Sequence, residues 1–161
     1  MILIGLGSNM NGKWGEPKAN LLQALRELEN HGVKLVRVSQ ILITAPFGKT
    51  DQANFANAVA MIESDLEPEG LLALLHEVEA QAGRVRQERW GPRVLDLDLL
   101  DHHGRVESGP AVLPHPGMAE RAFVLAPIAE IAPEWAHPLT GLGAHAMLAA
   151  LKGRSEGAVL P

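Results

Sequence analysis

Up to Leu100 the chain alternates between short apolar runs and longer stretches that carry a helical stripe. The apolar runs cover residues 2–6, 33–43, 55–62 and 94–100. Branched aliphatic side chains dominate the run 33–43, as is typical of strands. We therefore expect a strand at each of these four positions.

Two stretches between these runs carry apolar side chains at the spacing of one helix face. The first helix is expected over residues 17–30, where Pro17 suits the first turn and Gly32 ends the helix. The second is expected over residues 68–81, with Gly83 after its end. The stripes consist of Leu21, Leu22, Leu25 and Leu28 in the first helix and of Leu71, Leu72, Leu75 and Val78 in the second.

The order strand, helix, strand, strand, helix, strand predicts an α+β fold. It is the order of the ferredoxin-like βαββαβ plan, which has an antiparallel sheet. Residues 101–104 predict a hairpin turn, followed by a return strand from Arg105. In the C-terminal extension we expect a helix over residues 120–131, broken at Pro127, and another over 143–151.

The composition is that of one globular domain over residues 1–161, with 47% hydrophobic and 20% charged residues. The tail from Gly153 is expected to be mobile. The chain has no cysteine, no apolar run of membrane-spanning length and no basic start typical of a signal peptide. We therefore expect a cytoplasmic protein without membrane contact. The net charge of −5 argues against broad nucleic-acid binding, and no obligate protein partner is indicated.

Residues 7–13 (GSNMNGK) nearly match the phosphate-binding P-loop pattern G-x-x-x-x-G-K-[ST]. The last position of the pattern is Trp14, so the hydroxyl that would bind magnesium is missing. Met10 likewise replaces the third glycine of the dinucleotide-binding pattern. Both phosphate-loop interpretations are therefore disfavoured.

Asp96 and Asp98 lie two residues apart inside the last apolar run. On a strand they project from one face, while Leu95, Leu97 and Leu99 project from the other. A half-buried acidic pair is costly unless a cation neutralises it. Two carboxylates on residues about 6.5–7 Å apart can share one divalent cation or hold two. The alternative is an ion-pair network with the neighbouring arginines.

The segment before this strand concentrates positive charge. Residues 84–93 contain four arginines, Arg84, Arg86, Arg89 and Arg93, and one glutamate, a local charge of +3. Guanidinium groups suit phosphate oxygens. The sequence therefore predicts a focused anion site and not a general basic surface.

The three phenylalanines lie at the edges of predicted loops. Phe47 and Phe55 flank one loop, and Phe123 follows a Pro-His-Pro segment. Two facing rings could hold a flat ligand, and Asn57, on the same strand face as Phe55, could bond to its edge. The alternative is that each ring only fills the core.

His115, six residues before Arg121, fits a further phosphate contact. The alternative is a capping histidine and a solvated arginine. The remaining histidines show no spacing typical of metal ligands, and His102 and His103 are expected in an exposed turn.

Taken together, these segments resemble the 6-hydroxymethyl-7,8-dihydropterin pyrophosphokinase family of folate biosynthesis, over roughly residues 2–133. Four motif segments carry the resemblance: Gly7-Ser8-Asn9, Thr44–Asn57, Gly83–Asp98 and Pro114–Phe123. The third segment is the most specific. The resemblance implies a ferredoxin-like α+β fold and transfer of the β,γ-pyrophosphoryl group of ATP to the pterin hydroxymethyl oxygen, which releases AMP.

The resemblance also implies roles for individual residues. Asp96 and Asp98 would bind two Mg²⁺ ions that bridge the triphosphate, and with Arg84 and Arg93 they are the expected catalytic set. The pterin would contact Gly7, Thr44, Ala45, Pro46, Phe47, Phe55, Asn57, Asp96 and Phe123. ATP would contact His76, Glu79, Arg84, Arg86, Trp90, Arg93, Leu99, His115 and Arg121.

The chain departs from the family pattern in a few places. Related sequences often have an aromatic residue in place of Leu42, a proline in place of Ala45 and a tyrosine in place of Phe55. The loop between Arg86 and Arg89 also looks one residue shorter than in some relatives, which leaves the roles of these two arginines open.

Two other functions would use the same acidic pair. A magnesium-dependent phosphohydrolase would release phosphate from ATP without a pterin, and a binding module would hold ligand without forming AMP. The sequence indicates no general base for the acceptor alcohol. We expect the loops at 48–54 and 83–92 to close over the substrates.

Overall fold

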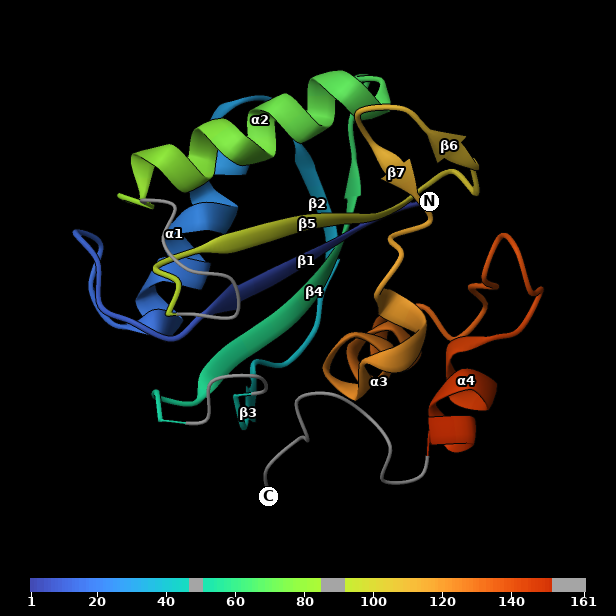
Figure 1. Cartoon of the computed structure of the whole chain (residues 1–161). Coiled ribbons are helices and arrows are strands. Elements are labelled where there is room, and N and C mark those ends of the chain that lie inside the picture. Colours follow the sequence, from blue (N-terminus) through green and yellow to red (C-terminus); the bar gives the residue numbers. More distant parts are fainter. Residues whose placement is uncertain (47–50, 85–91, 152–161) are drawn as a thin grey trace.

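The computed structural model describes residues 1–46, 51–84 and 92–151. Figure 1 shows a sheet with helices on both of its faces. The elements are β1 (Ile2–Ser8), α1 (Pro17–Asn30), β2 (Lys34–Val38), β3 (Leu42–Thr44), β4 (Phe55–Glu63), α2 (Pro68–Gln81), β5 (Asp96–His102), β6 (Glu107–Ser108), β7 (Val112–Leu113), the 3-10 helix η1 (Met118–Glu120), α3 (Ala122–Ile131) and α4 (Ala144–Leu151).

The main sheet has the strand order β2-β4-β1-β5, and the short strand β3 also pairs with β4. Every pairing in it is antiparallel. The prediction of an α+β fold with an antiparallel sheet is therefore confirmed. The helices predicted over 17–30 and 68–81 are α1 and α2, with the predicted bounds.

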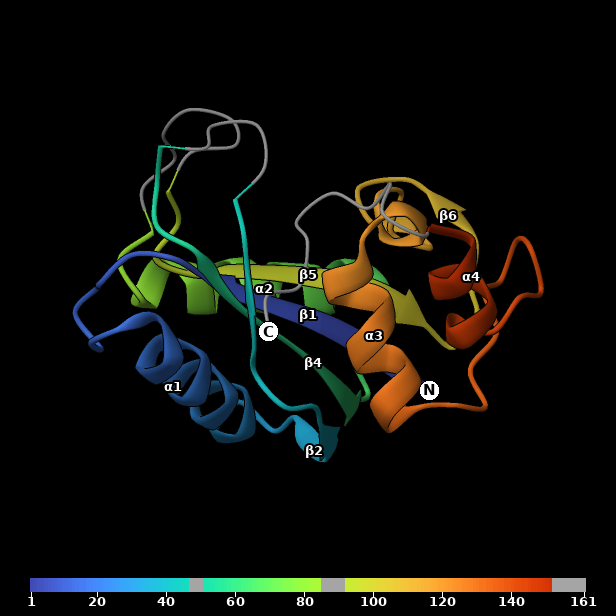
Figure 2. The ribbon, with the colours of Figure 1, turned by 90° about the horizontal axis from the view of Figure 1, so that it is seen from below.

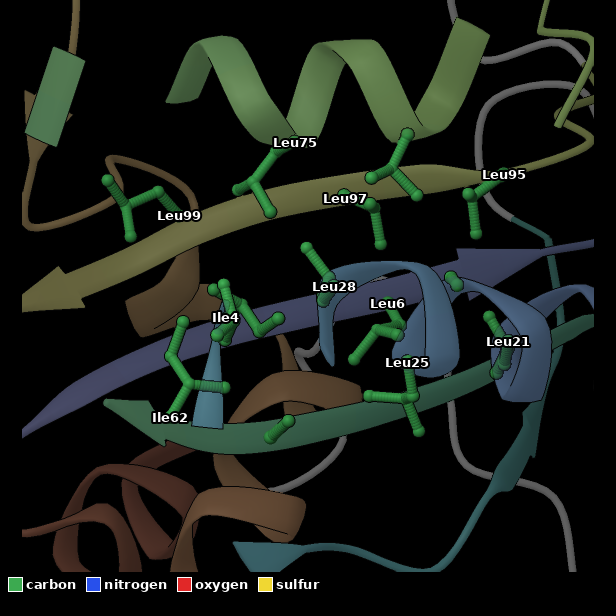
Figure 3. Packing of buried hydrophobic residues seen from close by; sticks show 14 of the residues in the cluster. Ile4, Leu6, Leu21, Leu25, Leu28, Ile62, Leu75, Leu95, Leu97 and Leu99 are labelled. Carbon is green, nitrogen blue, oxygen red and sulfur yellow. The ribbon is translucent and has the colours of Figure 1, made fainter. Parts of the chain in front are cut away.

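Two apolar layers enclose the sheet, because alternate side chains of a strand point to opposite faces. Ile2, Ile4 and Leu6 of β1 pack with the buried leucines of α1 and α2 (Figure 3). Leu3 packs on the other face, in a second cluster with Leu125 and the rest of α3 and α4. Figure 2 shows α3 in front of the strands and α2 behind them.

The stripes of α1 and α2 are less complete than predicted. Leu22 is 41% exposed, and Leu72 is only half-buried, beside a cavity described below. The remaining leucines of both stripes are buried in the predicted way. Within the described residues, no helix combines the length and the apolar character needed to cross a membrane.

The strand predicted over 33–43 is wrong as one element, because the structure has two strands, β2 and β3, that both pair with β4. Ser39 follows the end of β2 and is buried. Its backbone N–H donates to the Val59 carbonyl at 2.9 Å, and its hydroxyl accepts from the Val59 N–H, also at 2.9 Å. The Ser39 side chain thus takes the place of one backbone hydrogen bond between the strands, and β2 ends there.

The return strand predicted from Arg105 is also wrong. Instead, β5 continues to His102. The predicted exposure of His102 is wrong too, because this residue is buried and its ring forms a hydrogen bond of 2.9 Å with the Leu66 carbonyl. The turn follows at His103, which is exposed as predicted. Arg105 then pairs with Glu67 and is not in a strand. The next strand, β6, pairs with β7 in a separate small sheet.

The predicted break at Pro127 does not occur, and α3 is continuous from Ala122 to Ile131. Most of its side chains are buried, and we attribute its continuity to this packing, which outweighs the backbone hydrogen bond that a proline removes. The helix predicted over 143–151 is α4.

Candidate functional site

The sheet face that packs against α3 is hollow near the middle of β1. A cavity of about 280 Å³ opens there. Gly5 pairs with Val59 on β4 and with Asp98 on β5, and Gly7 pairs with Asn57 and Asp96 in the same way. The two glycines leave the centre of the floor without side chains, between polar groups on the flanking strands. The lining residues are Gly5, Leu6, Gly7, Thr44, Ala45, Phe55, Asn57, Ala58, Val59, Arg93, Asp96, Asp98, His115, Arg121, Phe123 and Val124.

The two aspartates at the start of β5 share one face, as predicted. Leu95, Leu97 and Leu99 are buried in the core under α1 and α2. Asp96 and Asp98 both line the cavity on the opposite face, and each side chain is 37% exposed. Burial is the largest cause that raises the pKa of Asp98, and the neighbouring Asp96 charge is the second. Together they raise this pKa to about 7, although Arg121 opposes the shift. The pair therefore favours a partner that brings positive charge.

Arg84 already supplies such a charge on one side. Its Nη1 lies 2.9 Å from Oδ1 of Asp96 and 2.5 Å from Oε2 of Glu79. The same Glu79 oxygen accepts the Leu97 backbone N–H at 2.8 Å. Burial raises the pKa of Glu79 to about 7, against the lowering effects of this N–H and of Arg84. Glu79 was predicted to line the nucleotide side, and its carboxylate also holds Arg84 against β5.

A second cavity, of about 290 Å³, lies between α2, β5 and the segment around β7. It shares Asp96, Asp98 and His115 with the first cavity. The aspartates therefore lie where two cavities meet. Its lining residues are Leu72, His76, Glu79, Arg84, Asp96, Leu97, Asp98, Leu99, Pro110, Ala111, Val112, Leu113, His115 and Pro116.

His115 faces the aspartates with a defined ring orientation. Its Nδ1 accepts the Gly117 N–H at 3.1 Å, so the neutral ring carries its proton on Nε2. Nε2 lies 3.8 Å from Oδ1 of Asp98. Burial is the largest cause that lowers the pKa of His115, and the positive charge of Arg121 is the second. The ring is therefore a neutral donor directed toward the acidic pair and not a fixed positive charge. The preceding Leu113–Pro114 peptide bond is cis.

The aromatic residues bound the first cavity from different elements. Phe55 comes from β4 and Phe123 from α3. Between the strands, the Asn57 amide donates to Thr44 Oγ1 at 2.6 Å, and both residues are buried. The Asn57 oxygen remains next to Gly7 on the floor. The prediction that Phe55 and Asn57 share a strand face is confirmed.

The arginines predicted for ATP do not all line the second cavity. Arg93 and Arg121 line the first, and Arg84 lines the second. Gly117 leaves room for Arg121, because a Cβ on Gly117 would lie 2.9 Å from the Arg121 Cζ. Pro46 lines neither cavity. Phe47, Arg86, Arg89 and Trp90 lie outside the described residues.

Asn9 has a central position that the sequence reasoning missed. Its side chain accepts the Arg93 backbone N–H at 2.8 Å. It also donates to Gln52 Oε1 at 2.7 Å and to the Ala53 carbonyl at 2.9 Å. One buried amide thus joins the segments before β5 and before β4. The only signal in the sequence was its place in the Gly7-Ser8-Asn9 motif.

The carboxylates of Asp96 and Asp98 suit a hard divalent cation whose remaining ligands come from a substrate. Among the residues of the three described ranges, no group of three or more His, Cys, Asp or Glu side chains could hold a metal. Two carboxylates are nevertheless the usual protein contribution for Mg²⁺, whose remaining ligands are phosphate oxygens and water.

Comparison with known proteins matches the chain to one enzyme family. A family model described as 7,8-dihydro-6-hydroxymethylpterin-pyrophosphokinase matches residues 3–133. A 2-amino-4-hydroxy-6-hydroxymethyldihydropteridine pyrophosphokinase of Methylorubrum extorquens is 46% identical over 133 residues, which is 81% of this chain and 82% of the relative. Its Bacillus subtilis counterpart is 45% identical over 130 residues, which is 80% of this chain and 75% of the relative. A mitochondrial folate synthesis bifunctional protein of Arabidopsis thaliana is 37% identical over 131 residues, 81% of this chain but 23% of the relative.

Proposed function

We propose that this chain, which belongs to the 7,8-dihydro-6-hydroxymethylpterin-pyrophosphokinase family, requires ATP and Mg²⁺ for its pyrophosphokinase activity in folate biosynthesis. In this reaction the hydroxymethyl oxygen of the pterin bonds to the β-phosphorus of ATP. The bond from that phosphorus to the α-phosphate bridging oxygen breaks, so that AMP leaves and the alcohol loses its proton. The observation that carries this proposal is the position of Asp96 and Asp98 between two cavities of different character.

The first cavity is the proposed acceptor site. Its walls include two phenylalanine rings, which favour a flat heterocycle. The Asn57 oxygen, held in place through Thr44, is an acceptor for ring N–H groups. Gly7, Ala45 and Asp96 complete the part of the proposed pterin set that lines this cavity.

The second cavity is the proposed nucleotide site, with His76, Glu79 and Leu99 on its walls. We assign phosphate contacts to Arg84 on the wall of this cavity, to His115, which lines both cavities, and to Arg93 and Arg121 on the wall of the first cavity. Transfer between the cavities would then pass the aspartates. This arrangement suits phosphoryl-type transfer, for which in-line positioning and charge neutralisation matter most.

Asp96 and Asp98 fit Mg²⁺, because hard carboxylate oxygens suit this cation. Burial and, second, the charge of Asp96 raise the pKa of Asp98, and a bound cation would offset both effects. When bound there, two Mg²⁺ ions would neutralise triphosphate charge. Asp96 would hold a cation next to Arg84, which Glu79 keeps close by through its own ion pair. Arg84 could then also contact a phosphate oxygen. The neutral Nε2–H of His115 can donate to a phosphate oxygen without repelling the cations.

We further propose that the sheet order β2-β4-β1-β5, with α1 and α2 on one face, is the ferredoxin-like arrangement. It places the N-terminal end of β5 next to the C-terminal end of β1, which is where both cavities lie. A cytoplasmic location and the lack of an obligate partner stay predictions from the sequence.

One assay tests the proposed function. The chain is incubated with ATP, Mg²⁺ and 6-hydroxymethyl-7,8-dihydropterin, and AMP and phosphate are followed with and without the pterin. We expect AMP only when both Mg²⁺ and the pterin are present. Phosphate release without the pterin would indicate a phosphohydrolase, and pterin binding without AMP would indicate a binding module; either result would reject the proposal.

A further inference from the structure

The near match to a phosphate-binding loop early in the chain does not contact the candidate site. Residues 8–20, which the structure describes throughout, line neither cavity. Backbone N–H groups that such a loop would offer to a phosphate already have partners in the protein. The Asn9 N–H donates to the Arg93 carbonyl at 3.0 Å, and the Gly12 N–H donates to the Gly15 carbonyl at 2.9 Å. The segment therefore has another role.

Gly12 lies against two residues that flank the arginines before β5. A Cβ built on Gly12 would lie 2.4 Å from Val94 Cγ1 and 3.2 Å from the Ala82 carbonyl oxygen. Ala82 caps the end of α2, two residues before Arg84, and Val94 directly follows Arg93. The missing side chain thus lets one turn of backbone contact both flanks at once.

Asn20 holds one of these flanks from α1. This residue is fully buried, and its side-chain amide donates to the Val94 carbonyl at 3.2 Å. The same amide donates to the Met10 carbonyl at 3.2 Å and to Ser8 Oγ at 3.3 Å. Because a buried carbonyl without a donor is costly, these contacts fix the backbone before β5 relative to α1 and to the turn.

Val94 is directly connected to the groups proposed to act on the phosphates and the metal. It follows Arg93 and precedes Asp96 by two residues. The Arg84 guanidinium, from the other flank, lies 2.9 Å from the Asp96 carboxylate. A side chain at position 12 that displaced Val94 would therefore move these groups together. A displacement of about 1 Å can slow a reaction by about a hundredfold, because the reacting atoms have to be aligned.

We propose that Gly12 and Asn20 are positioning residues for the transfer step. The turn of residues 8–15 does not bind phosphate itself but holds the backbone on both sides of the arginines that do. This inference rests on the proposed function, because it takes Arg84 and Arg93 as phosphate contacts.

The contacts of Gly12 and Asn20 described above reach the segment before β5. Asn9, in contrast, also bonds to Gln52 in the segment before β4, which carries part of the wall of the first cavity. Substitutions of Gly12 and Asn20 should therefore slow the transfer step without an equal loss of pterin binding.

The first test is Gly12→Ala, with Gly70→Ala as a matched control. Gly70 lies on α2 outside both cavities, and a Cβ there would meet Leu66 at 3.5 Å, which is ordinary contact. AMP formation is followed under single-turnover conditions, well below the melting temperatures of all variants, so that lower stability alone does not change the rate. Pterin affinity is measured by pterin fluorescence.

For Gly12→Ala we expect an at least tenfold slower single turnover and a pterin affinity within threefold of the wild type. Gly70→Ala should leave both unchanged. A fall in rate of less than tenfold, a loss of pterin affinity of more than threefold, or an equal fall in rate in Gly70→Ala would overturn the proposal.

A double variant, Gly12→Ala with Val94→Ala, separates positioning from a general loss of packing. The second substitution removes the Cγ1 atom that the new methyl group meets, and leaves the Val94 Cβ at 3.6 Å. We expect the double variant to turn over at least threefold faster than Gly12→Ala. If only core packing mattered, a second core truncation would bring no recovery, and that result would overturn the proposal.

Asn20→Ala covers the case in which Gly12→Ala folds poorly. It removes all three hydrogen bonds of the amide and adds no clash. We expect the same pattern, an at least tenfold slower single turnover with pterin affinity within threefold of the wild type, and a smaller fall in rate would overturn the proposal. Failure of the proposed function would look different, because the wild-type protein would then form no AMP.

Discussion

Asn9→Ala is the substitution whose effect follows most directly from the contacts at the site. The Asn9 side chain makes three hydrogen bonds, of 2.7, 2.8 and 2.9 Å, and the residue is 4% exposed. A hydrogen bond of this kind contributes about 0.5–1.5 kcal/mol net, so losing three lowers the free energy of unfolding by about 2–4 kcal/mol. For a chain of this size, 1 kcal/mol corresponds to about 2–4 °C, so we expect the melting temperature to fall by about 4–16 °C.

The same substitution should also impair turnover, because it frees two segments that bound the first cavity. Arg93 lines the cavity, and Gln52 and Ala53 precede the strand that carries Phe55. We expect pterin affinity and the single-turnover rate to fall together, since both segments lose their common anchor. Urea unfolding gives the stability, and AMP formation under single-turnover conditions gives the rate.

Two comparisons make this test specific. Asn9→Asp can still accept the Arg93 N–H, but it turns an oxygen toward the Ala53 carbonyl and buries a charge, so it should lose at least as much stability as Asn9→Ala. Asn11→Ala changes an exposed asparagine two residues away and should be neutral. The reasoning is refuted if the free energy of unfolding of Asn9→Ala lies within about 0.5 kcal/mol of the wild-type value, because surface substitutions without a structural role change it by about that much.

Three further predictions concern the charged residues. Asp98→Ala should remove nearly all AMP formation while pterin binding is kept, and magnesium-dependent activity in this variant would contradict its role. Burial and Asp96 raise the pKa of Asp98 from 3.8 to about 7, so the metal-free fold favours its protonated form; this contribution to stability is complete below about pH 4 and is lost as the pH rises through about 7. Affinity for Mg²⁺ with the ATP analogue should therefore rise between pH 6 and pH 8, and calorimetry should find this rise reduced in Asp98→Asn. Arg93→Ala should slow the chemical step more than it weakens pterin binding, and an unchanged single-turnover rate would reject that assignment.

The sequence predicted the elements whose pattern is decided locally. Period-2 alternation placed Asp96 and Asp98 on one face because the intervening Leu97 has to be buried. The bounds of α1 and α2 follow from a proline in the first turn and a glycine after the end. Where tertiary contacts decide, the pattern failed: the Ser39 hydroxyl ends β2, and burial of α3 overrides Pro127.

The site was predictable residue by residue but not as an arrangement. Chemistry singled out the carboxylates, the arginines and the rings one by one. That Gly5 and Gly7 lie between Asn57 and the aspartates depends on the pairing of β1 with β4 and β5, and register is set by the whole sheet. The role of Asn9 could not be read from its neighbours, because its partners lie more than forty residues away.

The most direct test of the account is a crystal structure of the chain with Mg²⁺, a non-hydrolysable ATP analogue and the pterin. The account predicts cations held by both Asp96 and Asp98, with phosphates in the second cavity and the pterin ring in the first. A structure in which the two carboxylates contact no cation, or in which the pterin lies outside the cavity bounded by Phe55 and Phe123, would contradict it.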